Sequence, residues 1–261
     1  MRAFGRWLLW MLFAAVALQV FFMGRIALMA VVDPQSTAFM RSEAWRVATQ
    51  SLSSDKPWRF SSQWVDYDQI SLHLKRAVMA AEDAGFTDHG GVDWDAIQSA
   101  RQKNERRQAQ ADKRAEQIER RLAKKPEAAE AAVKAIKPPK ISGGSTITQQ
   151  LAKNLLLSGE RNLLRKGQEL VLTLMLEALL SKQRILEIYL NSVEWGEGVF
   201  GAEAAAQRYF NKSAAKLSPN EAARLAVMLP SPKFFETRQG SAYLVRRTSS
   251  IVAQMSAVQA P

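Results

Sequence analysis

The chain has 261 residues, enough for one domain with a sizeable core once any membrane anchor is set aside. Lys and Arg number 36 against 25 Asp and Glu, and this excess predicts an anionic partner such as a phospholipid headgroup, a nucleic acid or a phosphorylated substrate. The absence of cysteine excludes disulfide bonds and thiolate metal sites.

An uncharged run of 18 residues, from 7 to 24, predicts a membrane-spanning helix near the N-terminus. As a helix the run would be about 27 Å long, close to the hydrocarbon thickness of a bilayer. A cleaved signal peptide is the alternative, but the run is longer than a usual signal core and no good small-residue cleavage site follows it. We therefore expect residues 1–32 to anchor a single domain formed by residues 33–261.

Basic residues on the two sides of this run predict its orientation. Arg2 and Arg6 precede it and place the N-terminus in the cytoplasm, although Arg25, Arg41 and Arg46 beyond it weaken the bias. The domain is then expected outside the cytoplasm. Lipid-linked phosphate is a better anionic partner there than nucleic acid.

Beyond the anchor, helix formers are abundant and alternating β-branched runs are scarce, which predicts a mainly helical fold. Residues 66–83 are expected to form one helix. Thr146 and Gln149 stand at capping-box spacing for a helix in residues 144–157. Residues 169–180 are apolar nearly all round, as expected of a central buried helix.

Residues 101–140 differ in kind from the rest of the chain. They contain 13 basic and 6 acidic residues and almost no large apolar ones, so they cannot build a core. We expect a solvated helix or a mobile excursion, ended by Pro138 and Pro139. A basic arm that lies near anionic lipid headgroups is the functional alternative.

Three motif matches carry no chemistry. Residues 196–201, GEGVFG, match a dinucleotide fingerprint, but a helix rather than a strand is predicted before them. Two S-x-x-K matches, at Ser53 and Ser213, lack the companion motifs of acyl-serine enzymes. His73 and His89 lack a second ligand at helical spacing, so no zinc site is expected.

Glu82 stands where a core residue is expected. It continues the stripe of Leu74 and Val78 at i+4, so its carboxylate points to the side on which the helix packs. Partial burial would raise its pKa toward neutrality and make it a usable general base. Asp83 lies about 100° further round the helix and serves equally as a structural partner for a backbone amide or a cation. Phe86 is expected to wall off the site.

Glu169 and Glu177 are a second pair of acidic residues, on one face of the apolar helix predicted at 169–180. Glu169 stands at i+4 from Arg165, so an ordinary intrahelical ion pair is the alternative to a catalytic role. A cluster of cations falls beside the helix start in residues 144–157: Lys153, Arg161, Arg165 and Lys166. Helix N-terminal amides and several cations are what a pyrophosphate needs.

Five motifs in order make the chain resemble the monofunctional peptidoglycan glycosyltransferases, which are similar to the glycosyltransferase domain of class A penicillin-binding proteins. Glu82, Asp83, Phe86, His89 and Gly91 fit the first motif, E-D-x-x-F-x-x-H-x-G. The others are GGSTITQQLAKN at 143–154, R-K-x-x-E at 165–169, KQRILEIYLN at 182–191 and a Gly- and Ala-rich motif from Gly198 to Phe210. The resemblance covers roughly residues 60–232.

The resemblance implies a mainly α, lysozyme-like glycosyltransferase domain on an N-terminal transmembrane helix. It implies polymerisation of lipid II: the growing glycan on undecaprenyl pyrophosphate is transferred to the GlcNAc 4-hydroxyl of lipid II, with inversion to a β-1,4 linkage. Glu82 would be the general base and Glu169 the second catalytic carboxylate, orienting cations or a bound metal ion. The implied substrate-binding residues are Asp83, Phe86, Ser145, Gln149, Gln150, Lys153, Arg161, Arg165 and Lys166.

The resemblance also implies where the protein works and with what. It places a single-pass protein in the inner membrane, with its domain in the periplasm and with lipid II, the growing glycan and other cell-wall synthesis and division proteins as partners. Nucleic acid is not expected as a partner. No metal-binding side chains are expected, and a divalent Mg or Mn ion at the pyrophosphate is the one cofactor that the resemblance leaves open.

Two rival functions remain at this point. A lysozyme-like enzyme that cleaves glycan would share the fold, but the cations and the anchor suit a pyrophosphate lipid better. A membrane-tethered scaffold whose basic arm recruits partners is the rival without catalysis. The segment 101–140 departs from the family, in which this connection is about thirty residues shorter.

Overall fold

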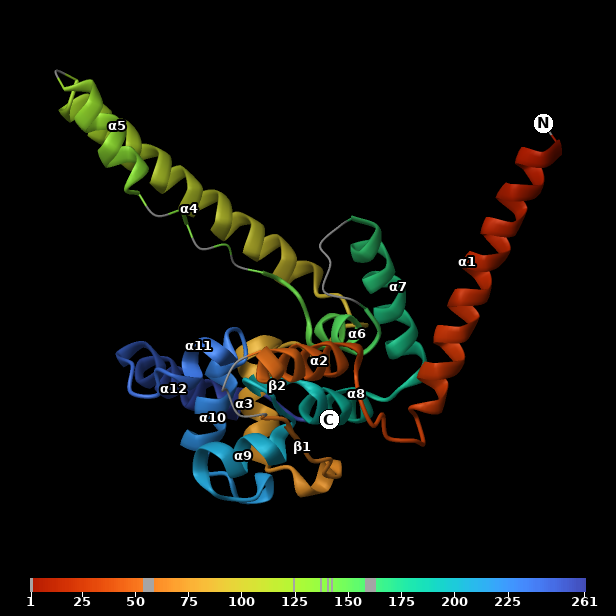
Figure 1. Cartoon of the computed structure of the whole chain (residues 1–261). Coiled ribbons are helices and arrows are strands. Elements are labelled where there is room, and N and C mark those ends of the chain that lie inside the picture. Colours follow the sequence, from red (N-terminus) through yellow and green to blue (C-terminus); the bar gives the residue numbers. More distant parts are fainter. Residues whose placement is uncertain are drawn as a thin grey trace. The chain divides into compact units, whose positions relative to one another are not determined.

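The computed structural model describes residues 2–53, 59–123, 125–136, 138–139, 141, 143–157 and 163–261. It divides into two compact units: residues 1–92 with 146–261, called the main unit here, and residues 93–145, called the hairpin unit. Figure 1 shows the elements of both units along the chain.

The main unit is mainly helical, as predicted. Its α-helices are α1 (Arg2–Leu28), α2 (Ala38–Ser53), α3 (Leu72–Glu82), α6 (Ile147–Leu156), α7 (Leu163–Leu179), α8 (Lys182–Ser192), α9 (Ala202–Phe210), α10 (Pro219–Met228), α11 (Pro232–Glu236) and α12 (Ala242–Gln254). Within the described residues, short 3₁₀ helices are η1 (Tyr67–Gln69), η2 (Ala214–Lys216) and η3 (Met255–Ala257). The strands β1 (Ser61–Ser62), β2 (Glu194–Gly196) and β3 (Val199–Phe200) form one small sheet in the order β1-β3-β2. β1 runs parallel to β3, and β2 runs antiparallel to it with an irregular register.

Helix α1 has the length and composition to cross a membrane. Its segment Ala3–Leu28 has a mean hydropathy of 2.0, and none of its most apolar stretch is buried in the protein. Its second half packs against α7, where Gln19 and Gln168 exchange side-chain hydrogen bonds. Arg184 of α8 donates to the Met29 carbonyl just after the helix. Helix α1 is therefore joined to the rest of the main unit through defined contacts.

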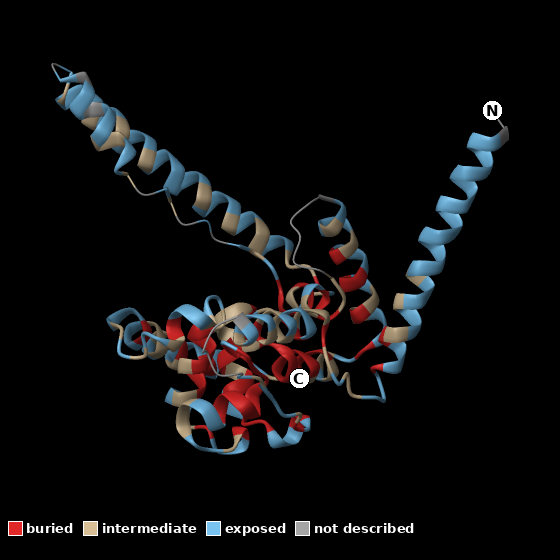
Figure 2. Cartoon of the chain, in the orientation of Figure 1, coloured by how far each residue is buried: buried red, intermediate tan, exposed pale blue. Residues whose placement is uncertain are grey.

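Helix α3 supplies the main packing face of the core. Leu74, Ala77 and Val78 are fully buried, and α3 packs against α10 and α12. The helix is shorter than the predicted range of 66–83, because Ser71 caps it by accepting from the His73 amide. Figure 2 shows the buried residues concentrated in α3 and the helices around it. The C-terminal end of α3, which carries Glu82, therefore lies at the edge of the core.

Helix α7 is only half buried, so the prediction of a central buried helix is wrong for its outer side. Leu172 and Leu176 are fully buried, whereas Leu174 is about half exposed. Leu170 and Val171 are also exposed. A helix that is apolar all round can be buried on every side or can leave one side exposed. Its composition alone does not distinguish these two arrangements.

The hairpin unit contains α4 (Trp94–Arg121) and α5 (Pro126–Lys134), which pack against each other. Asp93 begins α4 by accepting from the Ala96 amide, and no residue of α4 is buried. The solvated helix expected within residues 101–140 is therefore confirmed. Figure 2 shows α4 with exposed and intermediate residues along its length.

Glu194, on β2, is a buried carboxyl away from the predicted site. Its side chain is 8 % exposed and lies 3.3 Å from the Lys233 ammonium group, which also contacts Glu43. Burial raises the pKa of Glu194 to about 7, with the nearby Glu43 charge adding to the rise and Lys233 opposing it. The folded state therefore binds this proton more tightly than the unfolded chain does.

We expect Glu194→Gln to remove part of a loss of stability with rising pH. A carboxyl whose pKa is raised on folding lowers the free energy of unfolding as pH rises from about 4.5 to about 7, and glutamine does not ionise. Chemical unfolding from pH 4 to 8 should show the variant gaining about 1 to 3 kcal/mol on the wild type across that window. Glu197→Gln, a change at a half-exposed carboxyl in the same turn, is the control. A difference between Glu194→Gln and wild type that does not vary with pH would show that folding does not raise the pKa of Glu194.

Candidate active site

Glu82 is the last residue of α3 and carries the best-placed carboxyl for proton transfer. Its Oε2 accepts a hydrogen bond of 2.9 Å from the Gln150 side-chain amide, and Gln150 lies in the first turn of α6. The carbonyl oxygen of that amide accepts from the Tyr189 hydroxyl at 3.0 Å. Tyr189 is fully buried on α8, so it fixes which end of the Gln150 amide faces Glu82. Three helices thus hold the Glu82 carboxylate in one orientation.

The surroundings of Glu82 raise the pKa of its carboxyl above the usual value for a glutamate. Burial is the main cause that raises the pKa of this carboxyl above its usual value, and the adjacent charge of Asp83 adds to it. The hydrogen bond from Gln150 and the positive charges of Arg247 and Lys153 act in the opposite direction. The carboxyl is half-buried rather than sealed, so a substrate hydroxyl can reach it.

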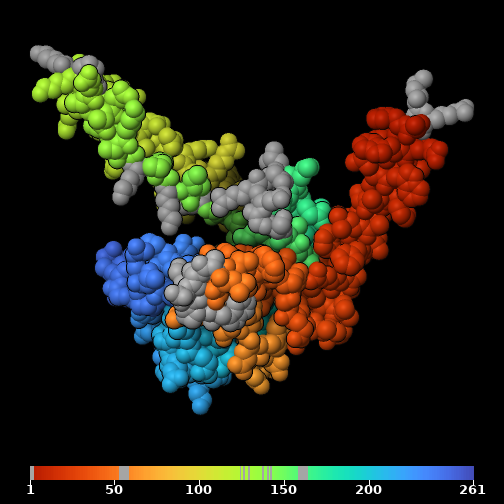
Figure 3. Space-filling model, in the orientation of Figure 1, coloured from red at the N-terminus to blue at the C-terminus, as the bar shows by residue number. Residues whose placement is uncertain are grey.

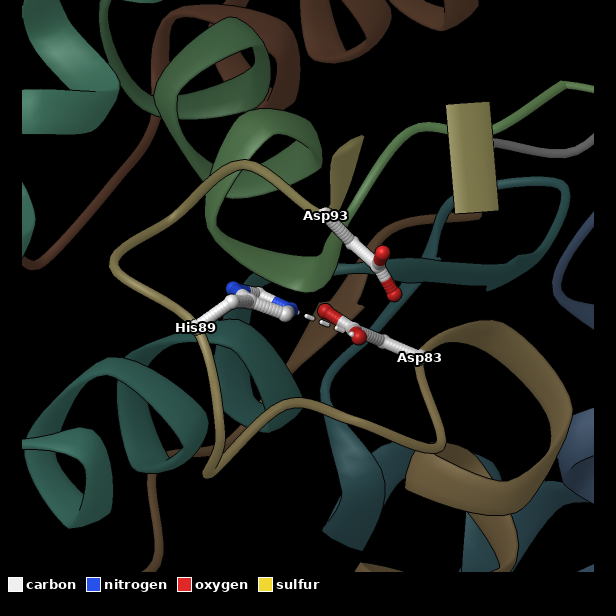
Figure 4. A group of neighbouring side chains, drawn as sticks. All are labelled: Asp83, His89 and Asp93. Carbon is white, nitrogen blue, oxygen red and sulfur yellow. Dashed lines mark hydrogen bonds and ion pairs between the residues drawn. The ribbon is translucent and has the colours of Figure 1, made fainter. Parts of the chain in front are cut away.

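Asp83 is buried and joins two parts of the main unit. One carboxylate oxygen lies 2.9 Å from His89 Nε2, and the other accepts from the Ile147 amide, also at 2.9 Å. The Gly91 amide donates to Nδ1 of the same imidazole, so Nε2 carries the hydrogen that is shared with Asp83. Figure 4 shows the Asp83–His89 contact; Asp93, also drawn there, is the cap of α4 described above. Asp83 therefore receives the first amide of α6, and the predicted role of backbone partner is confirmed.

The turn after α3 is tied to α6 and α7 at Gly91. Thr146 donates to the Gly91 carbonyl, and Gly91 has φ of +90°, a conformation that glycine adopts easily. A Cβ at this position would lie 2.7 Å from the Thr173 methyl and 2.8 Å from Glu177 Cγ on α7. The backbone needs glycine here both for its conformation and for the close approach of α7.

Glu177 and Lys182 brace the same turn. Thr148 of α6 donates to the Glu177 carboxylate, and Lys182 lies 2.9 Å from that carboxylate. Lys182 also donates to the His89 carbonyl and lies over the Phe86 ring, 4.5 Å from its centroid. These contacts give Glu177 a structural place in the main unit.

Of three further predicted substrate-binding residues, two are buried and one is exposed. The Phe86 ring is fully buried beneath Lys182, so it supports the turn from within. Gln149 is buried and completes the predicted capping box with Thr146, because its side chain accepts from the Thr146 amide. Ser145 is exposed and belongs to the hairpin unit. Substrate contacts for all three stay predictions.

Glu169 forms a second charged cluster, on α7. Its buried carboxylate lies 3.0 Å from the Arg165 guanidinium through one oxygen and contacts Lys166 through the other. The ion pair at i+4 that the spacing predicts is therefore present. Lys153 is exposed on α6, and Arg161 lies outside the described residues. The positive charge of Lys153 acts on Glu82, whereas Arg165 and Lys166 form ion pairs with Glu169.

The Glu169 cluster does not fit a divalent metal ion as it stands. Each carboxylate oxygen already contacts a cationic side chain, and a hard cation needs several oxygen ligands that are not themselves neutralised. The arrangement instead presents two cations held by one buried acid. Such a pair can receive an anionic oxygen of a phosphate.

Two residues near Glu82 were missed by the sequence analysis. Tyr189 lies inside the fourth motif, where its spacing from Lys182 could have pointed to the site. Arg247 comes from α12, beyond the last motif, and no local pattern marks it. Tyr189, Arg247, Gln150 and Lys153 together surround the Glu82 carboxyl, whose pKa is raised and which has positive charge nearby. Such a carboxylate can accept a proton from a hydroxyl that lies next to an anionic group.

Comparison with known proteins identifies the family. A family model described as Transglycosylase matches residues 50–125 and 123–256. The chain is 47 % identical over 249 residues to a biosynthetic peptidoglycan transglycosylase of Paraburkholderia phytofirmans, covering 95 % of this chain and 89 % of the relative. It is 44 % identical over 267 residues to a protein of the same name from Herminiimonas arsenicoxydans, covering the whole of both chains. The chain therefore belongs to the transglycosylase family and is a peptidoglycan glycosyltransferase, as its motifs predict.

Proposed function

We propose that this peptidoglycan glycosyltransferase polymerises lipid II. It would transfer the growing glycan from undecaprenyl pyrophosphate to the 4-hydroxyl of the GlcNAc of lipid II and form a β-1,4 linkage with inversion. The observation that carries this proposal is the half-buried Glu82 carboxyl, whose pKa is raised and which Gln150 holds in place.

Glu82 acts as the general base in this proposal. Its carboxylate takes the proton of the attacking hydroxyl while the new bond forms at the anomeric carbon, and the bond to the pyrophosphate oxygen breaks with its electron pair. A single displacement inverts the α linkage to β and needs one base but no covalent carboxylate. The raised pKa of Glu82 makes its carboxylate a stronger base than an ordinary glutamate, which suits this step.

The cations stabilise the departing pyrophosphate. Lys153 lies near enough to lower the pKa of Glu82, so its charge can also act on an anion bound beside the carboxyl. Arg165 and Lys166, held by Glu169, offer two further positive charges on α7. Glu169 is then a positioning residue that keeps these cations in place, and we propose no step through a metal ion.

The proposed location follows from α1. A single membrane-spanning helix would hold the main unit at the inner membrane, and the periplasmic side is where a polymer of lipid II is used. The lipid tail of the substrate would share the membrane with α1.

Labelled lipid II given to the purified full-length protein in detergent tests the function. We expect long glycan polymer from the wild type and, for Glu169→Gln, at least a tenfold loss that added Mg or Mn does not restore. Lys166→Gln, which removes one cation but keeps the Glu169–Arg165 pair, is the matched control and should lose less. Short fragments cut from preformed glycan would indicate a glycan-cleaving enzyme, and no turnover of either substrate would indicate a scaffold.

A further inference from the structure

Helix α4 sorts its charges onto two faces. At about 100° per residue, seven of its eight basic residues fall within an arc of about 140°: Lys103, Arg106, Arg107, Lys113, Arg114, Arg120 and Arg121. These seven are the basic face. Four of its five acidic residues fall within an arc of about 60° on the other side: Glu105, Asp112, Glu116 and Glu119. These four are the acidic face; the fifth acid, Asp95, lies in the first turn, before the basic face begins.

All seven residues of the basic face are exposed. The half-buried positions of α4, among them Ala111 and Ile118, lie on a third stripe, and α5 packs against α4 in the same unit. Figure 3 shows this hairpin as a space-filling surface in the yellow and light-green part of the colour scale. α5 thus covers apolar residues and leaves the basic face open to solvent.

Gathering like charges on one face lowers the stability of an isolated helix. Mixed charges at i+4 spacing stabilise a solvated helix, whereas like charges at that spacing, such as Lys103 and Arg107, destabilise it. One ion pair, Arg120 to Glu116 at 3.8 Å, links the two faces near the end of α4. A face that gathers cations in this way is suited to an extended anionic surface.

We propose that the basic face of α4 binds the anionic lipid headgroups of the membrane that holds α1. From Lys103 to Arg121 the face is about 27 Å long on a straight rod, which matches a plane better than a pocket. Four to eight clustered basic residues on a helix are what attracts a protein segment to anionic lipid. The membrane anchor keeps such headgroups close to the chain at all times, which favours them over a soluble polyanion.

The absence of cysteine from the chain allows a direct test, because a single introduced cysteine takes one fluorescent label. Gln110→Cys places the label at the centre of the basic face, and Gln108→Cys places it well away from that face. The full-length protein is reconstituted into vesicles of phosphatidylcholine alone or with phosphatidylglycerol. A quencher attached to the lipid headgroups reports how close each label lies to the membrane surface.

We expect phosphatidylglycerol to raise the quenching of the label at position 110 at least about twofold, and to raise it less for the label at position 108. Salt at 1 M should abolish the rise, because it shortens the screening length to about 3 Å. Neutralising Arg106, Lys113, Arg114 and Arg121 to glutamine should also abolish it. The matched control neutralises the acidic face, also by four charges, and should keep it.

Equal quenching of the label at position 110 in both kinds of vesicle would overturn the proposal. So would a response of this label to added peptidoglycan fragments but not to phosphatidylglycerol, which would assign the basic face to an anionic glycan. The quenching does not depend on catalysis and can be repeated with Glu82→Gln. A failure here therefore leaves the proposed polymerase function standing, and a loss of polymerisation leaves this inference standing.

Discussion

Glu82→Gln should lower the rate of lipid II polymerisation by about 100- to 10,000-fold, the range that a positioned general base contributes. Glutamine keeps the shape of the side chain, and its oxygen can still accept from the Gln150 amide, as Glu82 does. The variant keeps this contact but can neither take a proton nor carry a negative charge. Initial rates with labelled lipid II, measured for the full-length protein in detergent, check this result.

The stability of the same variant separates lost chemistry from lost folding. Burial raises the pKa of Glu82, so the folded state loses stability as pH rises from about 4.5 through the raised pKa. Glutamine avoids that loss, and the variant should unfold at the same or a higher denaturant concentration than the wild type at neutral pH. An inactive variant that is also less stable would remove the support for Glu82 as the base.

The pH dependence of the wild type gives a second measurement. A general base is active in its ionised form, so the rate should rise with pH through the pKa of Glu82, which lies above its usual value. Glu82→Gln should lack this rise. A rise that persists in the variant would belong to another group.

The core side of α3 could be predicted because its signal is local. Leu74, Val78 and Glu82 follow one another at i+4, and the structure puts the two apolar residues in the core and the carboxyl at its edge. The Thr146 capping box and the Arg165–Glu169 ion pair are local in the same way, and both are present. Spacing along one helix is sufficient for these features.

Contacts that cross the chain could not be predicted. Arg247, on α12, lies close enough to Glu82 for its charge to lower the pKa of that carboxyl. The sequence around Arg247 resembles that of an ordinary surface helix and does not point to this contact. The outer side of α7 was misjudged for a related reason, because apolar residues all round a helix do not show which side meets the core. Both cases depend on tertiary packing rather than on local pattern.

Asp83→Ala should cost about 2 to 4 kcal/mol of stability. The change leaves the His89 Nε2–H and the Ile147 amide without their acceptor inside the main unit. Such a loss lowers the melting temperature by about 4 to 16 °C for a domain of this size. Asp88→Ala, at an exposed aspartate in the same turn, is the control and should change it little.

The pH dependence of the residual activity of Asp83→Ala shows whether the contacts of Asp83 with His89 and the Ile147 amide hold α6 in place. Ile147 and Gln150 share the first turn of α6, so release of that turn weakens the hydrogen bond that lowers the pKa of Glu82. Removal of the Asp83 charge alone lowers the same pKa, but this effect is smaller than that of the Gln150 bond. The rise of rate with pH should therefore move to higher pH if Asp83 holds α6 in place. A move to lower pH would mean that α6 stays where it is and that Asp83 acts on Glu82 through its charge.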